Sequence, residues 1–209
     1  MATILITGFG PFPGAPYNPT VRLVRALARL RRPALAGATL VGHVFETSYA
    51  AVDRDLPQLI ARHRPDALLM FGLHGRARKI RIETRARNAL ALLPDASGQV
   101  LRKGVIAPDR PVDMTLRAPG RVLLAAARAS RVPSTLSRDA GRYLCNYLCW
   151  RATETLAPPG PRLAAFIHVP RVARFARPRR RGKRKFTADN LARAGQAILV
   201  ALAAAVNRS

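Results

Sequence analysis

The sequence is poor in the residue types that build disulfide frameworks, metal centres and base-stacking surfaces. Its 209 residues include two cysteines, four histidines and one tryptophan, and only 6% are aromatic. Cys145 and Cys149 are too few for a disulfide framework, and the scattered histidines do not have the ligand spacing of a zinc site. We therefore expect neither a metal ion nor any other cofactor.

Long apolar runs and linkers are absent as well. No segment is an unbroken apolar run that could span a bilayer, and the opening MATILITGFG lacks the basic start and apolar core of a signal peptide. No membrane association is expected, and the expected location is the cytoplasm. Without an internal repeat or a linker, residues 1–209 are predicted to form a single domain with a full core.

Acidic residues are scarce, and the balance of charge is strongly positive. The 36 Lys and Arg against 11 Asp and Glu leave a formal net charge of +25. Most of these cations are arginines scattered along predicted helix faces, a pattern that also arises in genomes rich in Arg and Ala codons. The exception is the run RVARFARPRRRGKRK, from Arg171 to Lys185, which is predicted to be a basic loop that can move.

This basic run is the one feature that favours an anionic partner, because clustered cations release counterions from phosphates. Phe175 is its only aromatic residue, so a stacking platform for bases is not indicated. Binding of nucleic acid through Arg171 to Lys185 is therefore an alternative that the sequence does not favour.

Apolar strands and amphipathic helices alternate over the first third of the chain. Residues 2–8, 38–46 and 66–72 are predicted to be strands, with helices opening at Asn18-Pro19 and covering residues 48–63. This alternation predicts an α/β fold, an α/β/α sandwich with a mainly parallel twisted sheet between helices. Functional sites in such sheets lie at the carboxyl ends of the strands.

The rest of the chain extends the same pattern with one interruption. Residues 79–94 alternate in polarity, which predicts an antiparallel excursion. The remaining predicted elements are a turn at 94–98, a helix at 117–130 that Pro119-Gly120 interrupts early, an extended segment at 133–137, a helix at 143–154, a central strand at 162–170, and a helix at 187–206 with Thr187 as its N-cap.

The stretch SRDAGRYLCN places a cysteine where reactivity is favoured. Cys145 falls in the first turn of a predicted helix, and a helix N-terminus stabilises a thiolate. Its alternative role is that of a small buried hydrophobic residue, as for most free cysteines. Cys149, one turn deeper, is assigned that structural role.

A nucleophilic cysteine needs a general base and a group that orients the base. His168 ends an apolar strand and precedes Pro170, so it should project at the carboxyl edge of the sheet; its alternative is a satisfied core histidine. Glu83 is the candidate orienting group because neighbouring cations would keep it ionised, although a surface ion pair is the alternative.

Several motifs occur together in an order that resembles one enzyme family. They are TGFGPF with NP soon after, a Glu followed by Asn88, PDxxG, SxxAGxYxCN and FIHVP. This set resembles the pyroglutamyl peptidase I family, also called pyrrolidone-carboxyl peptidases. The resemblance implies a cytosolic, homo-oligomeric (dimeric or tetrameric) cysteine peptidase that removes an N-terminal pyroglutamate through a thioester. Its Cys-His-Glu triad would fall on Cys145, His168 and Glu83.

The resemblance also implies a pocket for the pyroglutamyl ring. Phe9 and Phe12 would sandwich the ring, although core packing is the alternative for both. Residues expected nearby are Thr47, Tyr143 and Leu144. The loop GLHGRA at residues 72–77 departs from the usual GQAGGR, with Leu73 in place of a glutamine in the substrate pocket. A related hydrolase with altered N-terminal specificity is therefore a further alternative.

Overall fold

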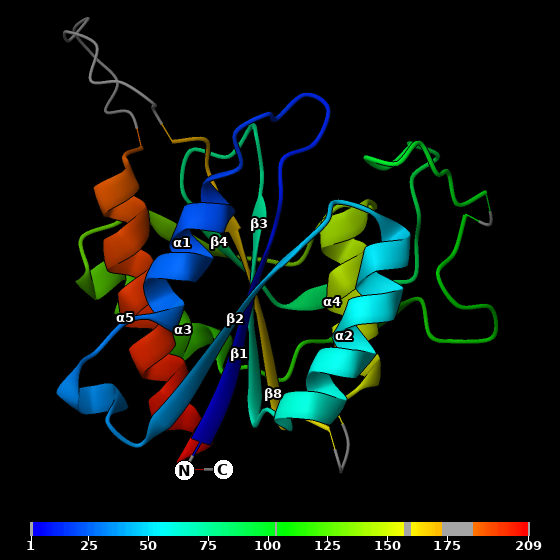
Figure 1. Ribbon diagram of the computed structural model, residues 1–209. Coiled ribbons are helices and arrows are strands. Elements are labelled where there is room, and N and C mark those ends of the chain that lie inside the picture. Colours follow the sequence, from blue (N-terminus) through cyan, green and yellow to red (C-terminus); the bar gives the residue numbers. More distant parts are fainter. Residues whose placement is uncertain (1, 103, 157–159, 173–185, 209) are drawn as a thin grey trace, which may run out of the picture.

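Six strands form one mixed sheet in the order β2-β1-β3-β8-β4-β7. The computed structural model describes residues 2–102, 104–156, 160–172 and 186–208 (Figure 1). Only β4 and β8 pair antiparallel; every other neighbouring pair in this sheet is parallel. The strands are β1 (Ala2–Phe9), β2 (Ala38–Phe45), β3 (Ala67–Leu73), β4 (Ile80–Glu83), β7 (Ser134–Ser137) and β8 (Leu163–Val169).

Helices cover both faces of this sheet, which confirms the predicted α/β/α architecture. One layer holds α1 (Pro19–Ala28), α3 (Gly120–Ala129) and α5 (Ala188–Val206), and the other holds α2 (Tyr49–His63) and α4 (Leu144–Glu154) (Figure 1). A short 3₁₀ helix, Pro33–Leu35, leads into β2. Alternate residues of each strand enter opposite cores: Ile6 packs with the α1/α3/α5 layer, whereas Leu5 packs with the α2/α4 layer.

The helix starts follow local capping chemistry. Asn18 caps α1 by accepting a hydrogen bond from the Thr20 amide, and Ser48 caps α2 in the same way. Thr187 is the N-cap of α5, as predicted, and it also forms a reciprocal capping box with Asn190. The third predicted helix begins at Gly120 and not at residue 117, because Pro119 occupies the N-cap position.

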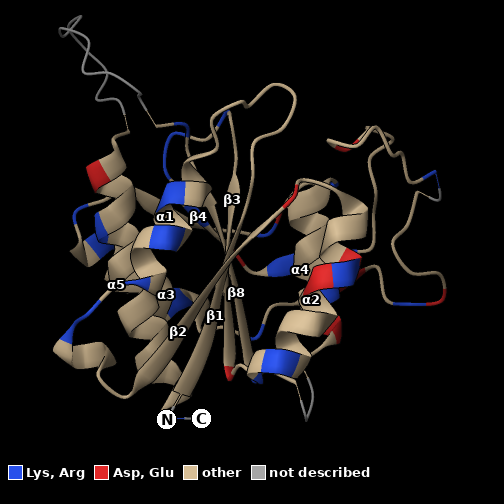
Figure 2. Ribbon diagram, in the orientation of Figure 1, with Lys and Arg blue, Asp and Glu red and all other residues tan. Residues whose placement is uncertain are grey.

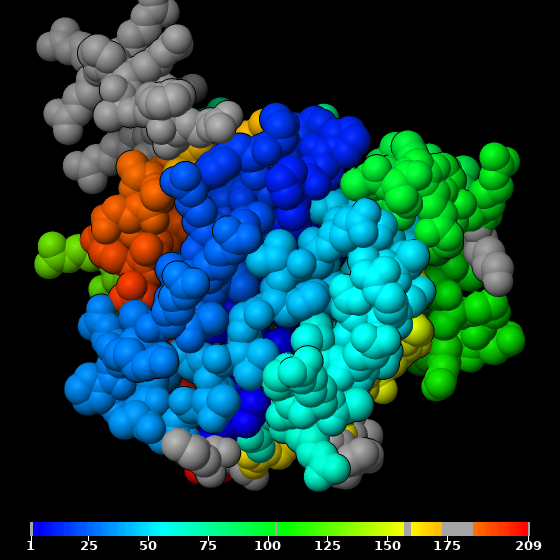
Figure 3. Space-filling model, in the orientation of Figure 1, coloured from blue at the N-terminus to red at the C-terminus, as the bar shows by residue number. Residues whose placement is uncertain are grey.

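A small antiparallel ribbon and a long loop follow β4. The ribbon pairs β5 (Arg85–Arg87) with β6 (Asp113–Thr115), and the second strand was not predicted from the sequence. Residues 88–102 and 104–112 of the intervening loop stand beside α2 at one edge of the molecule (Figure 3). Asn88 organises this loop, because its side chain accepts hydrogen bonds from the amides of Ile106 and Ala107.

The positive charge is distributed and not gathered on one element. Figure 2 shows Lys and Arg in both helical layers, with few acidic residues between them. Most of the predicted basic loop, residues 173–185, lies outside the described residues.

Candidate active site

One row of residues crosses the sheet on the face that α2 and α4 cover. Gly72 of β3 lies opposite His168 of β8, and His168 lies opposite Arg81 of β4. When the register of β1 and β3 is continued by two residues, Phe9 is the neighbour of Gly72 on the other side. The row therefore brings together residues from four strands at the carboxyl ends of β1, β3 and β8, where a site was predicted.

Cys145 lies directly above Gly72. It lies in the first turn of α4, as predicted, and a Cβ atom on Gly72 would approach its Sγ to 2.7 Å. Only glycine leaves room for the thiol there, because real Cβ contacts are longer. The turn before the helix contains Gly141 at φ +84°, a left-handed conformation that favours glycine.

Asn146 anchors the start of α4; it ends the SxxAGxYxCN motif, but no role was predicted for it. Its buried side chain accepts a hydrogen bond from the Arg87 amide and donates to the carbonyls of Arg87 and Ala89. These bonds join the helix that carries Cys145 to β5, just beyond Glu83. A buried polar residue next to the cysteine was the available signal, since such groups need partners.

His168 and Glu83 form a buried pair. The Nδ1 atom of His168 lies 2.8 Å from Oε1 of Glu83, and the two residues are 3% and 2% exposed. Glu83 is therefore not a surface ion-pair residue. Its other oxygen accepts a hydrogen bond from the Asp139 amide at 3.3 Å, so both oxygens are held in place.

The surroundings of His168 favour its protonated form. Burial alone would lower the pKa of the imidazole, but the charge of Cys145, hydrogen bonds to Cys145 and Glu83, and the charge of Glu83 raise the pKa to about 9. At neutral pH this histidine therefore holds a proton beside the cysteine. Reactive cysteines lie in such electropositive, partly exposed surroundings, and Cys145 is half-buried.

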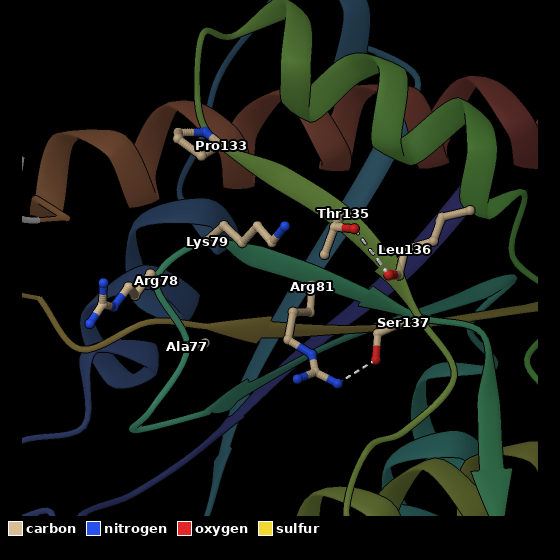
Figure 4. A pocket seen from close by; sticks show the side chains of 8 residues that line it. All are labelled: Ala77, Arg78, Lys79, Arg81, Pro133, Thr135, Leu136 and Ser137. Carbon is tan, nitrogen blue, oxygen red and sulfur yellow. Dashed lines mark hydrogen bonds between the residues drawn. The ribbon is translucent and has the colours of Figure 1, made fainter.

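Arg81 connects the pair to the edge of the sheet, and it is one of the neighbouring cations that were expected to keep Glu83 ionised. Its guanidinium donates to the Ser137 hydroxyl at 2.6 Å (Figure 4). It also donates to Glu83 through Nε at 3.3 Å and to the Asp139 carbonyl at 3.0 Å. The alternation of β4 places Arg81 and Glu83 on the same face. This alternation could be read from the sequence, but the contact of Arg81 with Ser137 of β7 could not.

Two rings flank the His168 imidazole. Phe166, two residues earlier on β8, meets it edge-on with ring centroids 5.0 Å apart, and His74 does so from the loop after β3 at 5.3 Å. Burial and the neighbouring His168 lower the pKa of His74, which keeps its ring neutral at neutral pH. These contacts restrict how the His168 ring can rotate.

The predicted ring-binding phenylalanines have different environments. Phe9 is 2% exposed and packs against Phe45 with ring centroids 5.9 Å apart, which agrees with the core-packing alternative for that residue. Phe12 is half-buried in the loop after β1, where its backbone pairs with Ala15. Thr47 joins this loop to the end of β2, because its hydroxyl donates to the Gly10 carbonyl at 3.0 Å.

The other predicted pocket residues lie around the start of α4 and the end of β3. Tyr143 is half-buried and donates its hydroxyl hydrogen bond to the Pro94 carbonyl at 3.0 Å. Leu144 is buried, and Leu73 is the half-buried last residue of β3. The structure thus gathers these residues at one end of the sheet, and contact with a substrate ring remains a prediction.

Comparisons with known proteins all point to one family of peptidases. The family model described as pyroglutamyl peptidase matches residues 2–206. A pyrrolidone-carboxylate peptidase of Thermococcus kodakarensis is 30% identical over 169 residues, which cover 80% of each chain. One from Deinococcus radiodurans is 31% identical over 84% of this chain and 81% of its own. The solved structure of pyrrolidone carboxyl peptidase from Thermococcus litoralis has a TM-score of 0.89 at 26% identity, covering 100% of this chain and 96% of that one.

Proposed function

Because the chain belongs to the pyroglutamyl peptidase family, we propose that it removes an N-terminal pyroglutamyl residue from peptides with Cys145 as the nucleophile. The observation that carries this assignment of roles is the half-buried Cys145 next to the buried pair of His168 and Glu83. Covalent catalysis of this kind divides a difficult amide hydrolysis into two easier acyl transfers.

In the first step the Cys145 thiolate attacks the carbonyl carbon that links the pyroglutamyl residue to the rest of the peptide. A C–S bond forms, and the carbonyl electrons move to oxygen. His168, already protonated, gives its proton to the leaving nitrogen as the C–N bond breaks. In the second step water attacks the thioester, His168 takes a proton from that water, and the thiolate is released.

Glu83 is proposed to orient and charge-stabilise the imidazolium through its 2.8 Å contact with Nδ1. That contact leaves Nε2 as the nitrogen that exchanges protons with the reacting atoms. The amides in the first turn of α4 are proposed to bind the developing oxyanion, because the Tyr143 side chain does not cap them.

The test is release of a fluorescent amine from a pyroglutamyl amide under reducing conditions. We expect Cys145→Ala to abolish release, with a loss of about 10⁴-fold or more in kcat. The matched control is Cys149→Ala, which should retain turnover, because burial raises the pKa of that thiol and keeps it inert. Full turnover in a folded Cys145→Ala variant would exclude the proposed nucleophile.

Location and assembly are proposed from the family resemblance. We propose a homo-oligomer, a dimer or a tetramer, that acts in the cytoplasm. Within the part of the chain that the structure describes, none of the helices is long and apolar enough to cross a membrane.

A further inference from the structure

A cationic hollow lies beside the proposed catalytic row. It occupies about 430 Å³ at the edge of the sheet formed by β4 and β7, and its walls include Arg78, Lys79, Arg81, Thr135 and Ser137. Figure 4 shows Lys79 just before β4, Arg81 on β4, and Thr135 and Ser137 on β7. None of these residues was assigned to substrate binding above.

The hollow shares a face and a row with the reacting groups. Arg81 is the direct neighbour of His168 on one side and of Thr135 on the other. Its bond to Glu83 places it on the same face as the His168 ring. Since neighbouring strands lie about 4.8 Å apart, the hollow begins one strand from the imidazole and extends roughly 10 Å from it.

This order of residues along the row sets the direction of a bound substrate, if the proposed function holds. The acyl carbon must lie at Cys145, above Gly72, with the pyroglutamyl ring on the side of Phe9. The leaving nitrogen must lie near His168 to receive its proton. The departing peptide therefore continues away from Phe9, over Arg81 and Thr135. Two extended residues span about 7 Å, enough to reach the hollow.

The charges of the hollow indicate which peptides it fits. Arg78 and Lys79 are exposed, and no acidic side chain pairs with either among the described residues. Arg81 has Glu83 as its partner, so the two exposed cations are the ones open to a ligand. Their complement is a carboxylate.

We propose that this hollow is the subsite for the departing peptide, and that it selects substrates with a carboxylate in the first two residues after the pyroglutamyl group. The inference rests on the proposed function and names the substrate class. A neutral ring on one side of Cys145 and an acidic residue on the other would then be recognised by separate parts of the same row.

The test compares kcat/KM for two amidated tetrapeptides, pyroglutamyl-Glu-Ala-Ala and pyroglutamyl-Gln-Ala-Ala, at low ionic strength. We expect the wild type to prefer the acidic peptide by about three- to tenfold, as exposed ion pairs allow. In the double variant Arg78→Gln, Lys79→Gln the ratio should fall close to one.

The matched control removes the same charge from the other helical layer. Arg25 and Arg29 are exposed on or at the end of α1, which packs against the opposite face of the sheet. Arg25→Gln, Arg29→Gln should keep the wild-type ratio. An equal fall in this control would overturn the subsite, because the preference would then come from net charge alone.

Two further outcomes are decisive. Cleavage of both peptides at equal rates by the wild type would overturn the subsite and leave the peptidase activity established. Failure to cleave either peptide, by a folded protein, would overturn both the subsite and the proposed function.

Discussion

Gly72 shows how a single missing side chain makes room for a nucleophile. A Cβ at this position would lie 2.7 Å from the Cys145 sulfur and 2.6 Å from the Phe166 ring. Gly72 is the last but one residue of β3. Its backbone cannot shift away from the thiol, because it is paired with β8. The absence of a side chain at this position therefore fixes how closely the Cys145 thiol and the Phe166 ring can approach β3.

Gly72→Ala should therefore impair catalysis more than folding. Displacement of the thiol by about 1 Å should lower kcat/KM by about 100-fold, and overpacking should cost about 1–3 kcal/mol of unfolding free energy. Both are measured with the fluorogenic assay and urea unfolding. Gly37→Ala is the control, because nothing lies within 4 Å of a Cβ there. Wild-type turnover in Gly72→Ala would contradict this account.

Glu83→Gln should shift the pH dependence of the reaction. Glu83 contributes to raising the pKa of His168 to about 9, so removal of its charge should lower that pKa. The imidazolium is then lost at lower pH, and the basic limb of the profile should move toward neutrality. A pH series of kcat/KM measures this. Glu46→Gln, an exposed carboxylate at the end of β2, should leave the profile unchanged; an equal shift in both variants would contradict the specific role.

The start of α2 depends on a loop that is distant in the sequence. Asp95 is buried and accepts hydrogen bonds from the amides of Tyr49, Ser97 and Gln99, and from the Ser97 hydroxyl. The same turn supplies the Pro94 carbonyl to Tyr143, the residue that precedes α4. The turn at Pro94 and Asp95 therefore contacts the starts of both helices on the face of the candidate site.

Asp95→Asn should destabilise this part of the fold. Burial alone would raise the pKa of Asp95, but the hydrogen bonds from Ser97, Tyr49 and Gln99 lower it below 3.8. A depressed carboxyl pKa contributes stability above the unfolded value and loses it as the pH falls through the folded value. We expect a loss of about 1–3 kcal/mol at pH 7, which shrinks in strong acid. Urea unfolding at several pH values measures it, with the exposed Asp109→Asn as control; a difference that does not change with pH would contradict the cause given.

The net charge of +25 acts on the molecule as a whole. Cations are spread over both helical layers, so two copies approach each other against mutual repulsion (Figure 2). At 0.1 M salt the Debye length is about 10 Å, so repulsion between exposed charges farther apart than this is largely screened. Assembly and capture of acidic peptides should therefore respond to salt in opposite directions.

The proposed homo-oligomer should accordingly dissociate at low ionic strength and form as salt is added. Light scattering over a series of salt concentrations measures the mass of the assembly. The mass of a single chain, 22.8 kDa, at every salt concentration would contradict the homo-oligomer.

Much of the secondary structure was predictable because its causes are local. The N-caps Asn18, Ser48 and Thr187 bond to amides two or three residues away, and alternating or helical periodicity needs only neighbouring residues. The short strand β6 was missed because its partner β5 lies far back along the chain. A three-residue strand has too little pattern of its own to be detected.

The sequence by itself determined the α/β order of elements and, through its motifs, the three residues proposed to react. It could not determine what surrounds them. The antiparallel register of β4 and β8 brings Arg81 beside His168, although the two are separated by much of the chain, and β7 then completes the cationic hollow. Register between distant strands is decided by how whole faces pack, and a shift of one residue would turn Arg81 and Glu83 away from His168. Only the tertiary structure could therefore decide that the Cys145 thiol packs against Gly72, which groups contact Glu83, and which surface is open to the departing peptide.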